Sequence, residues 1–329
     1  MSLGLLVLFF WNQDVGQIWS GLLEVRPLWI VPGIVVYFFG IWLRAVRWRL
    51  LMLPFAQVPS MRLAGVILIG FTVNNIVPLR IGELARTFVL RRSHGVPIPA
   101  TLATILIERV LDMVALSALM ALAFIFERER MLTGWIGAAS YFCAAVTAGG
   151  VAGLAVLLLI PRRLLDALLD FGTRLATRVH RRLGEVVASC VDGVRALEDP
   201  RSLLGVVVLS VACWLAEAGT YVFMMYAVGF QMSMWGLVAG MVVANLATAI
   251  PSSPGYVGTF DVLLKSLLTD AFAVPDATAA VFTLLAHAVL FIPVVVAGLV
   301  LLSREDLSFH ALARGRVEGR EPVSQQPAS

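Results

Sequence analysis

The sequence has little charge. Only 14% of its 329 residues are Asp, Glu, Lys or Arg, whereas 60% are hydrophobic, and the mean hydropathy is +0.90. Soluble domains carry about 25% charged residues, so this composition excludes an ordinary soluble protein. We therefore expect an all-α integral membrane protein with about six to eight transmembrane segments, two of them broken or re-entrant hairpins in inverted repeats.

Residues that hold metals or act as nucleophiles are also scarce. Cys143, Cys190 and Cys213 lie in apolar or amphipathic stretches without metal-ligand spacing, so we interpret them as small buried hydrophobic residues. The sequence shows no Walker motif, Asp-x-Asp, His/Cys cluster or nucleophile elbow. We expect no cofactor and no direct use of ATP, and the lack of a catalytic motif argues against an enzyme.

Long apolar runs predict the spans. They cover residues 28–53, 98–126, 134–160, 202–227 and 277–303, with broken stretches at 61–92 and 234–272. Residues 3–11 are apolar but too few to cross, so they form either a short tilted helix or the remnant of a longer one. The predicted division is a short first helix and external loop (1–27), first repeat (28–126), linking span (134–160), basic amphipathic segment (161–200), second repeat (201–303) and disordered cytoplasmic tail (304–329).

Arginine clusters predict the orientation. The first clear span ends in Arg44, Arg47, Trp48 and Arg49, which we interpret as an interfacial anchor. The positive-inside rule places the arginine clusters in the cytoplasm, together with the C-terminus. The net charge of +4 then indicates anionic lipid as a partner and no nucleic acid. We expect a multi-pass protein of the bacterial inner membrane.

Residues 162–200 differ from the spans. Apolar residues recur there at three- and four-residue spacing, and arginines occupy the other faces. This pattern predicts one or two amphipathic helices that lie on the anionic inner leaflet or pack beneath the bundle.

An unusually polar stretch interrupts the apolar segments at 74–86. Ionisable side chains at membrane depth are costly and usually mark a working site, and backbone groups that leave a helix need polar partners. The stretch therefore predicts a re-entrant element that lines a polar cavity. Its helix-breaking residues are Pro78 and Gly82, and its polar residues are Asn75, Arg80, Glu83 and Arg86.

A second break indicates an internal repeat. It contains Pro251, Pro254, Gly255 and Gly258, and it shares Pro-x-x-x-Gly with the first break. The order span, broken hairpin, span therefore occurs twice. Arginine placement predicts that the hairpin at 61–92 enters from the cytoplasm and the one at 234–272 from the opposite face, as in many secondary transporters.

Charged residues within the predicted span at 98–126 need partners. A local pair between Arg109 and Asp112 would leave Glu108 needing Arg80 or Arg86 from the break. Two interpretations remain open. The charges form either a buried ion-pair network that locks the hairpin to this helix, or the cationic floor of a cavity for an anionic headgroup. Arginine suits the second task because its fork binds phosphate through two hydrogen bonds.

The second repeat carries fewer charges. Asn245 and His287 are candidates for a second polar site, although a lone histidine is more often a packing residue. Asp261 and Lys265 are four residues apart and are expected to pair locally. Glu217 lies inside the span at 202–227.

Four motifs of the chain belong together. They are Arg47-Trp48, Asn75-x-x-Pro78-x-Arg80-x-Gly82-Glu83-x-x-Arg86, Glu108-Arg109-x-x-Asp112 and Pro254-Gly255-x-x-Gly258. With these motifs the chain resembles the lysylphosphatidylglycerol synthase transmembrane family, whose best-known member is the flippase half of the multiple peptide resistance factor. The resemblance covers residues 28–303 and implies a lipid flippase. We expect no soluble synthase domain, so aminoacyl transfer to lipid is not implied.

The leading functional hypothesis is a translocase that moves a polar or anionic-headgroup lipid between leaflets. Arg80, Arg86 and Arg109 would contact the headgroup, and the acidic residues around them would orient the arginines. The alternatives are a membrane-embedded transferase acting on polyprenyl-linked or phospholipid substrates, and a scaffold for envelope assembly. Homo-oligomerisation is left open.

Overall fold

The structure, a computed structural model, is helical throughout the part of the chain that it describes. The described residues are 9–10, 14–77, 81–132, 134–159, 162–196, 199–249 and 254–304. Pro78, Arg80 and Pro251 lie outside them, as do most of the predicted short helix at 3–11 and the tail at 305–329.

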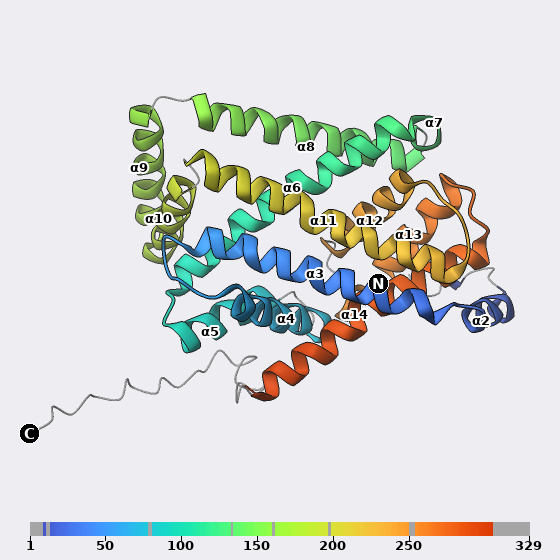
Figure 1. Cartoon of the computed structure of the whole chain (residues 1–329). Helices are drawn as coiled ribbons and strands as arrows, with labels where there is room; N and C mark the ends of the chain where they lie inside the picture. The colour runs from blue at the N-terminus through green and yellow to red at the C-terminus, as the bar shows by residue number, and fades with distance from the viewer. Residues whose placement is uncertain are drawn as a thin grey trace, which may run out of the picture.

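Five described helices are long and apolar enough to cross a membrane, and α4 (Ser60–Ile76) and α12 (Met234–Ala249) are apolar but shorter. Figure 1 shows α3, α8 and α11 running lengthwise through one bundle. The predicted all-α membrane protein is confirmed. The five long helices are α3 (Pro27–Met52), α6 (Ile98–Phe126), α8 (Gly134–Leu159), α11 (Pro200–Val228) and α14 (Asp276–Arg304).

Two sets of four consecutive helices have similar lengths. Helices α3, α4, α5 (Gly82–His94) and α6 have 26, 17, 13 and 29 residues. Helices α11, α12, α13 (Thr259–Asp270) and α14 have 29, 16, 12 and 29. The packing is exchanged between the sets, because α4 contacts α14 while α12 contacts α6, and α3 contacts α11. This arrangement is the one expected of two repeats related by a pseudo-two-fold axis.

The first hairpin, α4 with α5, closes on glycine. The Gly82 N–H donates to Asn74 Oδ1 at 2.7 Å. A Cβ atom on Gly82 would overlap the carbonyl oxygen of Gly70 and lie 2.6 Å from Asn74 Oδ1. The two helices therefore approach closely only because both positions lack side chains.

Replacing Gly82 by Ala should destabilise the protein by about 1–3 kcal/mol, as overpacking of a tight contact does. Thermal unfolding in detergent measures this effect. Gly149→Ala in α8 is the matched control, since a Cβ there meets nothing within 4 Å, and alanine favours a helix over glycine by about 1 kcal/mol. Equal melting temperatures for the two variants would contradict the close approach.

The basic segment forms two helices, α9 (Arg162–Val179) and α10 (Arg181–Ala196), which pack on each other. Helix α10 also packs on α6, and Figure 1 shows α9 running crosswise to the long helices at one end of the bundle. Among the residues of this segment whose burial is described, the exposed large apolar side chains are Phe171, Leu175, Val179 and Leu183. The segment, predicted to form one or two amphipathic helices, therefore forms two.

The prediction of a loop up to residue 27 was wrong, because Val15–Leu23 forms helix α2. Asp14 starts this helix by accepting a hydrogen bond from the Gly16 N–H at 2.9 Å, a cap signal in the sequence that was overlooked. Ile18 is 3% exposed and packs in a small cluster with Val281 of α14, so burial of one apolar face stabilises the helix.

Candidate functional site

Three residues predicted to form an interfacial anchor are buried inside the bundle. Arg44, Arg47 and Trp48 are 3%, 0% and 0% exposed, so the anchor interpretation was wrong for them. Arg49 is exposed and remains compatible with it. The physical reason is that each buried guanidinium group has a carboxylate partner. Arg44 pairs with a glutamate of α11, and Arg47 pairs with two acidic residues of α6.

Arg47, Arg86, Glu108 and Asp112 form a buried ion-pair cluster. Arg47 lies 2.7 Å from Asp112 and 3.1 Å from Glu108, and Arg86 lies 2.8 Å from Glu108. The Arg86 guanidinium also stacks over the Trp48 ring at 3.9 Å. The predicted pairing of Glu108 with an arginine of the break is thus confirmed for Arg86. The cluster connects α3, α5 and α6, and so holds the first hairpin in place.

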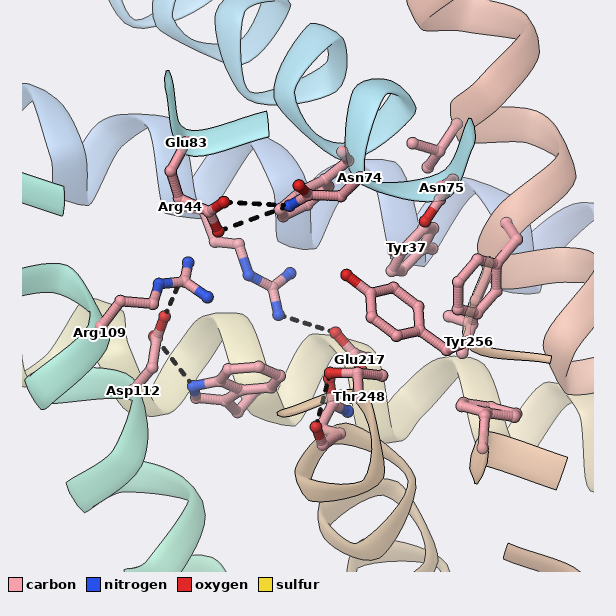
Figure 2. Close-up of a pocket in the computed structure, with 17 residues that line it drawn as sticks. Tyr37, Arg44, Asn74, Asn75, Glu83, Arg109, Asp112, Glu217, Thr248 and Tyr256 are labelled. Atoms are coloured by element: carbon pink, nitrogen blue, oxygen red, sulfur yellow. Dashed lines mark hydrogen bonds and ion pairs between the residues drawn. The ribbon is translucent and has the colours of Figure 1, made fainter. Parts of the chain in front are cut away.

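A polar cavity of about 110 Å³ lies where the two helix breaks meet. Asn74 and Asn75 enter it from the end of α4, and Thr248 and Tyr256 enter from α12 and the short helix η1 (Pro254–Tyr256). A Cβ on Gly255 would lie 3.7 Å from the Asn75 carbonyl oxygen, so the tips of the two hairpins are in contact. Figure 2 shows the Arg44 guanidinium in the middle of this cavity.

Arg44 joins the two sets of four helices, because it lies on α3 and pairs with α11. Its Nη2 lies 2.7 Å from Glu217 Oε2, and its guanidinium lies 4.5 Å from the centre of the Trp214 ring. Asn245 Nδ2 donates to the other Glu217 oxygen at 2.6 Å. Arg44 Nη1, although buried, has no hydrogen-bond partner among the residues that the structure describes. A donor that is buried and unused is costly, so this atom is available to a ligand in the cavity.

Arg109 is the more open cation of the cavity. Its side chain is 41% exposed and lies 3.3 Å from Asp112, which confirms the predicted local pair. Asp112 also accepts hydrogen bonds from Arg47 at 2.7 Å and from the Trp214 indole at 3.2 Å. Asp112 is therefore held by two hydrogen-bond donors and by the ion pair with Arg109, and Arg109 is the partner that reaches outward.

The structure places the predicted site residues in three groups. Arg86 and Glu108 belong to the ion-pair cluster and do not line the cavity. His287 lies near the second break. Arg80 belongs to none of the groups, because it lies outside the described residues. The predicted residues that do line the cavity are Asn75, Glu83, Arg109, Asp112 and Asn245.

His287 fixes the second break. Its Nδ1 lies 2.7 Å from Asp261 Oδ1 and its Nε2 lies 3.0 Å from the Gly255 carbonyl oxygen. The predicted Asp261–Lys265 pair was wrong, because Lys265 pairs with Asp276 at 3.2 Å. Asp261 instead faces the break, where it also accepts the Gly258 N–H at 2.9 Å. This histidine therefore stabilises the conformation of the second hairpin tip and does not line the cavity.

Sequence reasoning missed several lining residues. Tyr37, Arg44, Asn74, Trp214 and Glu217 all line the cavity and were not proposed for it. A signal was present, because Arg44 and Glu217 are opposite charges well inside two apolar spans, and such charges usually pair with one another.

Comparison with known proteins agrees with a multi-pass membrane protein. The lysylphosphatidylglycerol synthase TM region family matches residues 1–298. The chain is 25% identical over 317 residues to glycosyltransferase AglD of Haloferax volcanii, covering 88% of this chain and 50% of that protein. The chain thus spans about half the length of this relative. It is 24% identical over 283 residues to a UPF0104 membrane protein of Methanothermobacter thermautotrophicus, covering 80% and 82% of the two chains. No solved structure matches. The chain belongs to the lysylphosphatidylglycerol synthase TM region family.

Proposed function

We propose that this protein is a flippase-like lipid translocase, which moves a lipid with a polar or anionic headgroup between the leaflets of the bacterial inner membrane. The observation that carries the proposal is the polar cavity between the two hairpin tips, where Arg44 keeps an unused donor and Arg109 is half-exposed. A headgroup cannot cross the hydrocarbon without partners for its polar atoms. The cavity offers such partners in the middle of the bundle.

The hairpins support a route through the protein. Helices α4 and α12 have 17 and 16 residues, which at about 1.5 Å per residue is about 25 Å, shorter than a hydrocarbon core of about 30 Å. Figure 1 shows α4 and α5 toward the end that carries α9 and α10, and α12 and α13 toward the opposite end. We infer that both hairpins are re-entrant from opposite faces, so that movement of either tip opens the cavity to one side.

Cysteine labelling tests this topology. In a variant without Cys143, Cys190 and Cys213, Arg91→Cys at the end of α5 should react from the cytoplasm and Asp270→Cys at the end of α13 from outside. Both positions are exposed. Glu129→Cys, in the α6–α8 connection, is the reference for the outer face. Labelling of positions 91 and 270 from the same side would contradict opposite insertion.

Four charged groups of the cavity have roles in the proposal. Arg109 and Arg44 contact the headgroup phosphate, for which guanidinium groups supply strong charge-assisted hydrogen bonds. Asp112 and Glu217 hold these two arginines at 3.3 and 2.7 Å. Arg86, predicted to touch the headgroup, is instead a structural residue in this scheme because Glu108 already binds it.

A second candidate is a membrane-embedded transferase, favoured by the similarity to the Haloferax volcanii protein, which is named as a glycosyltransferase. Leaflet-resolved lipidomics of cells with and without this protein separates the two. A translocase should change the sidedness of one lipid while its total amount stays constant. Disappearance of a lipid species from both leaflets would support the transferase and refute translocation as the primary activity.

A further inference from the structure

An apolar groove of about 430 Å³ adjoins the polar cavity. It runs between α6, α10 and α12, and its apolar wall comes mainly from one face of α6. The two spaces share the polar residues at their junction, including Glu83, Arg109 and Asp112. The apolar lining residues are Leu102, Ile105, Leu106, Met113, Leu116, Val186 and Leu246.

We propose that this groove binds an acyl chain of the lipid whose headgroup occupies the cavity. The proposal rests on the proposed function and adds a site for the chain. An amphiphile needs one polar and one apolar compartment in continuous contact, and the cavity and groove provide both. Arg109 lines both spaces, so it lies where the phosphate joins the glycerol and the chain.

The composition of the groove favours a hydrocarbon chain over a peptide. A peptide in an apolar groove leaves backbone N–H and C=O groups that need partners. All polar residues that line the groove, Glu83 and Arg109 among them, also line the cavity. They therefore lie where the groove meets the cavity. A saturated or unsaturated chain has no such groups and gains about 0.8 kcal/mol per buried methylene.

Helix α10 gives the groove its outer wall. Val186 lines the groove, and a Cβ on Gly193 would lie 2.6 Å from Ile107 Cδ1, so α10 rests closely on α6. Helix α9, packed on α10, exposes Phe171 and Leu175. In this proposal, helices α9 and α10 lie where a lipid would pass laterally from the bilayer into the groove.

Photo-crosslinking tests the site. The full-length protein is reconstituted in phosphatidylcholine vesicles that contain phosphatidylglycerol with a diazirine in one acyl chain, and adducts are mapped by mass spectrometry. We expect adducts to concentrate between Leu102 and Leu116. Met113→Trp, which fills the groove, should reduce them by about tenfold, equivalent to about 1.4 kcal/mol. Leu106→Trp provides a second filling variant if the first does not fold.

Leu122→Trp is the matched control. Leu122 and Met113 lie on the same helix and are both 40% exposed, but Leu122 lines neither space. Its substitution should leave the adducts unchanged. Adducts spread evenly along exposed α6 positions, with no effect of either filling variant, would indicate surrounding bilayer lipid only and would overturn the groove.

The same vesicles separate this proposal from the proposed function. Groove adducts that Met113→Trp removes, in a protein that does not move fluorescent phosphatidylglycerol between leaflets, would support the groove and argue against a phosphatidylglycerol translocase. Translocation that is unaffected by Met113→Trp and Leu106→Trp would refute the groove and leave the translocase standing.

Discussion

Replacing Glu108 by Gln should lower the free energy of unfolding by about 3–5 kcal/mol, because removal of one partner leaves a buried charge uncompensated. Glu108 is 1% exposed and holds Arg47 at 3.1 Å and Arg86 at 2.8 Å. Glutamine keeps the shape and one acceptor but removes the negative charge that both guanidinium groups share. Chemical unfolding in detergent micelles, followed by circular dichroism, measures the loss.

Glu127→Gln is the matched control for this experiment. Glu127 pairs with Arg130 at 3.1 Å in the connection between α6 and α8, where the arginine side chain is 56% exposed and the glutamate side chain 11%. Solvent screens a pair with such an exposed partner, and surface pairs contribute about 0–1 kcal/mol, so this variant should lose far less stability than Glu108→Gln. A Glu108→Gln protein as stable as the Glu127→Gln protein would show that the buried cluster does not hold the hairpin.

Arg109→Gln should reduce lipid translocation roughly ten- to a hundredfold with little loss of stability. A hydrogen bond to a charged group contributes about 1.5–3 kcal/mol, and 1.4 kcal/mol is a factor of ten. The fold should tolerate the change, because Asp112 keeps Arg47 and the Trp214 indole as donors. Translocation of fluorescent phosphatidylglycerol in vesicles and thermal unfolding in detergent measure the two effects.

Two further variants define the role of Arg109. Arg109→Lys keeps the charge but loses the planar fork, so its translocation rate should lie between those of the unchanged protein and the Gln variant. Arg91→Gln removes an exposed arginine of α5 that does not line the cavity, and should translocate normally. A parallel loss of activity and melting temperature in Arg109→Gln would identify this arginine as structural instead.

The spans could be predicted because their signal is local. The apolar run at 98–126 coincides with α6, and the run at 28–53 differs from α3 by one residue at each end. Pro27 and Pro200 start their helices in the first turn, where proline costs no hydrogen bond. The same locality explains why the Arg109–Asp112 pair, three residues apart, was predicted correctly.

Pairing between distant helices could not be predicted from spacing. Arg44 and Glu217 are 173 residues apart. Taken alone, Arg44 resembles an interfacial anchor and Glu217 resembles an isolated buried charge. Asp261 was assigned to Lys265 because an i, i+4 pair is visible in the sequence. Its true partner, His287, is 26 residues away on the next helix, and only the packing of α13 on α14 brings the two together.

Helices of the first set pack on helices of the second, so these contacts form in a fixed order during synthesis. Helix α4 contacts α14, and the Thr72 hydroxyl donates to the Val294 carbonyl oxygen at 3.1 Å across 222 residues. At about 5–20 residues per second, the ribosome makes this partner roughly 10–40 s after α4. During that interval the first hairpin packs against α3, α6 and, once it is made, η1, but lacks its contact with α14. The polar cavity therefore comes into existence last, when α14 inserts, and a nascent chain stopped before residue 276 would hold its arginines without the wall that closes over them.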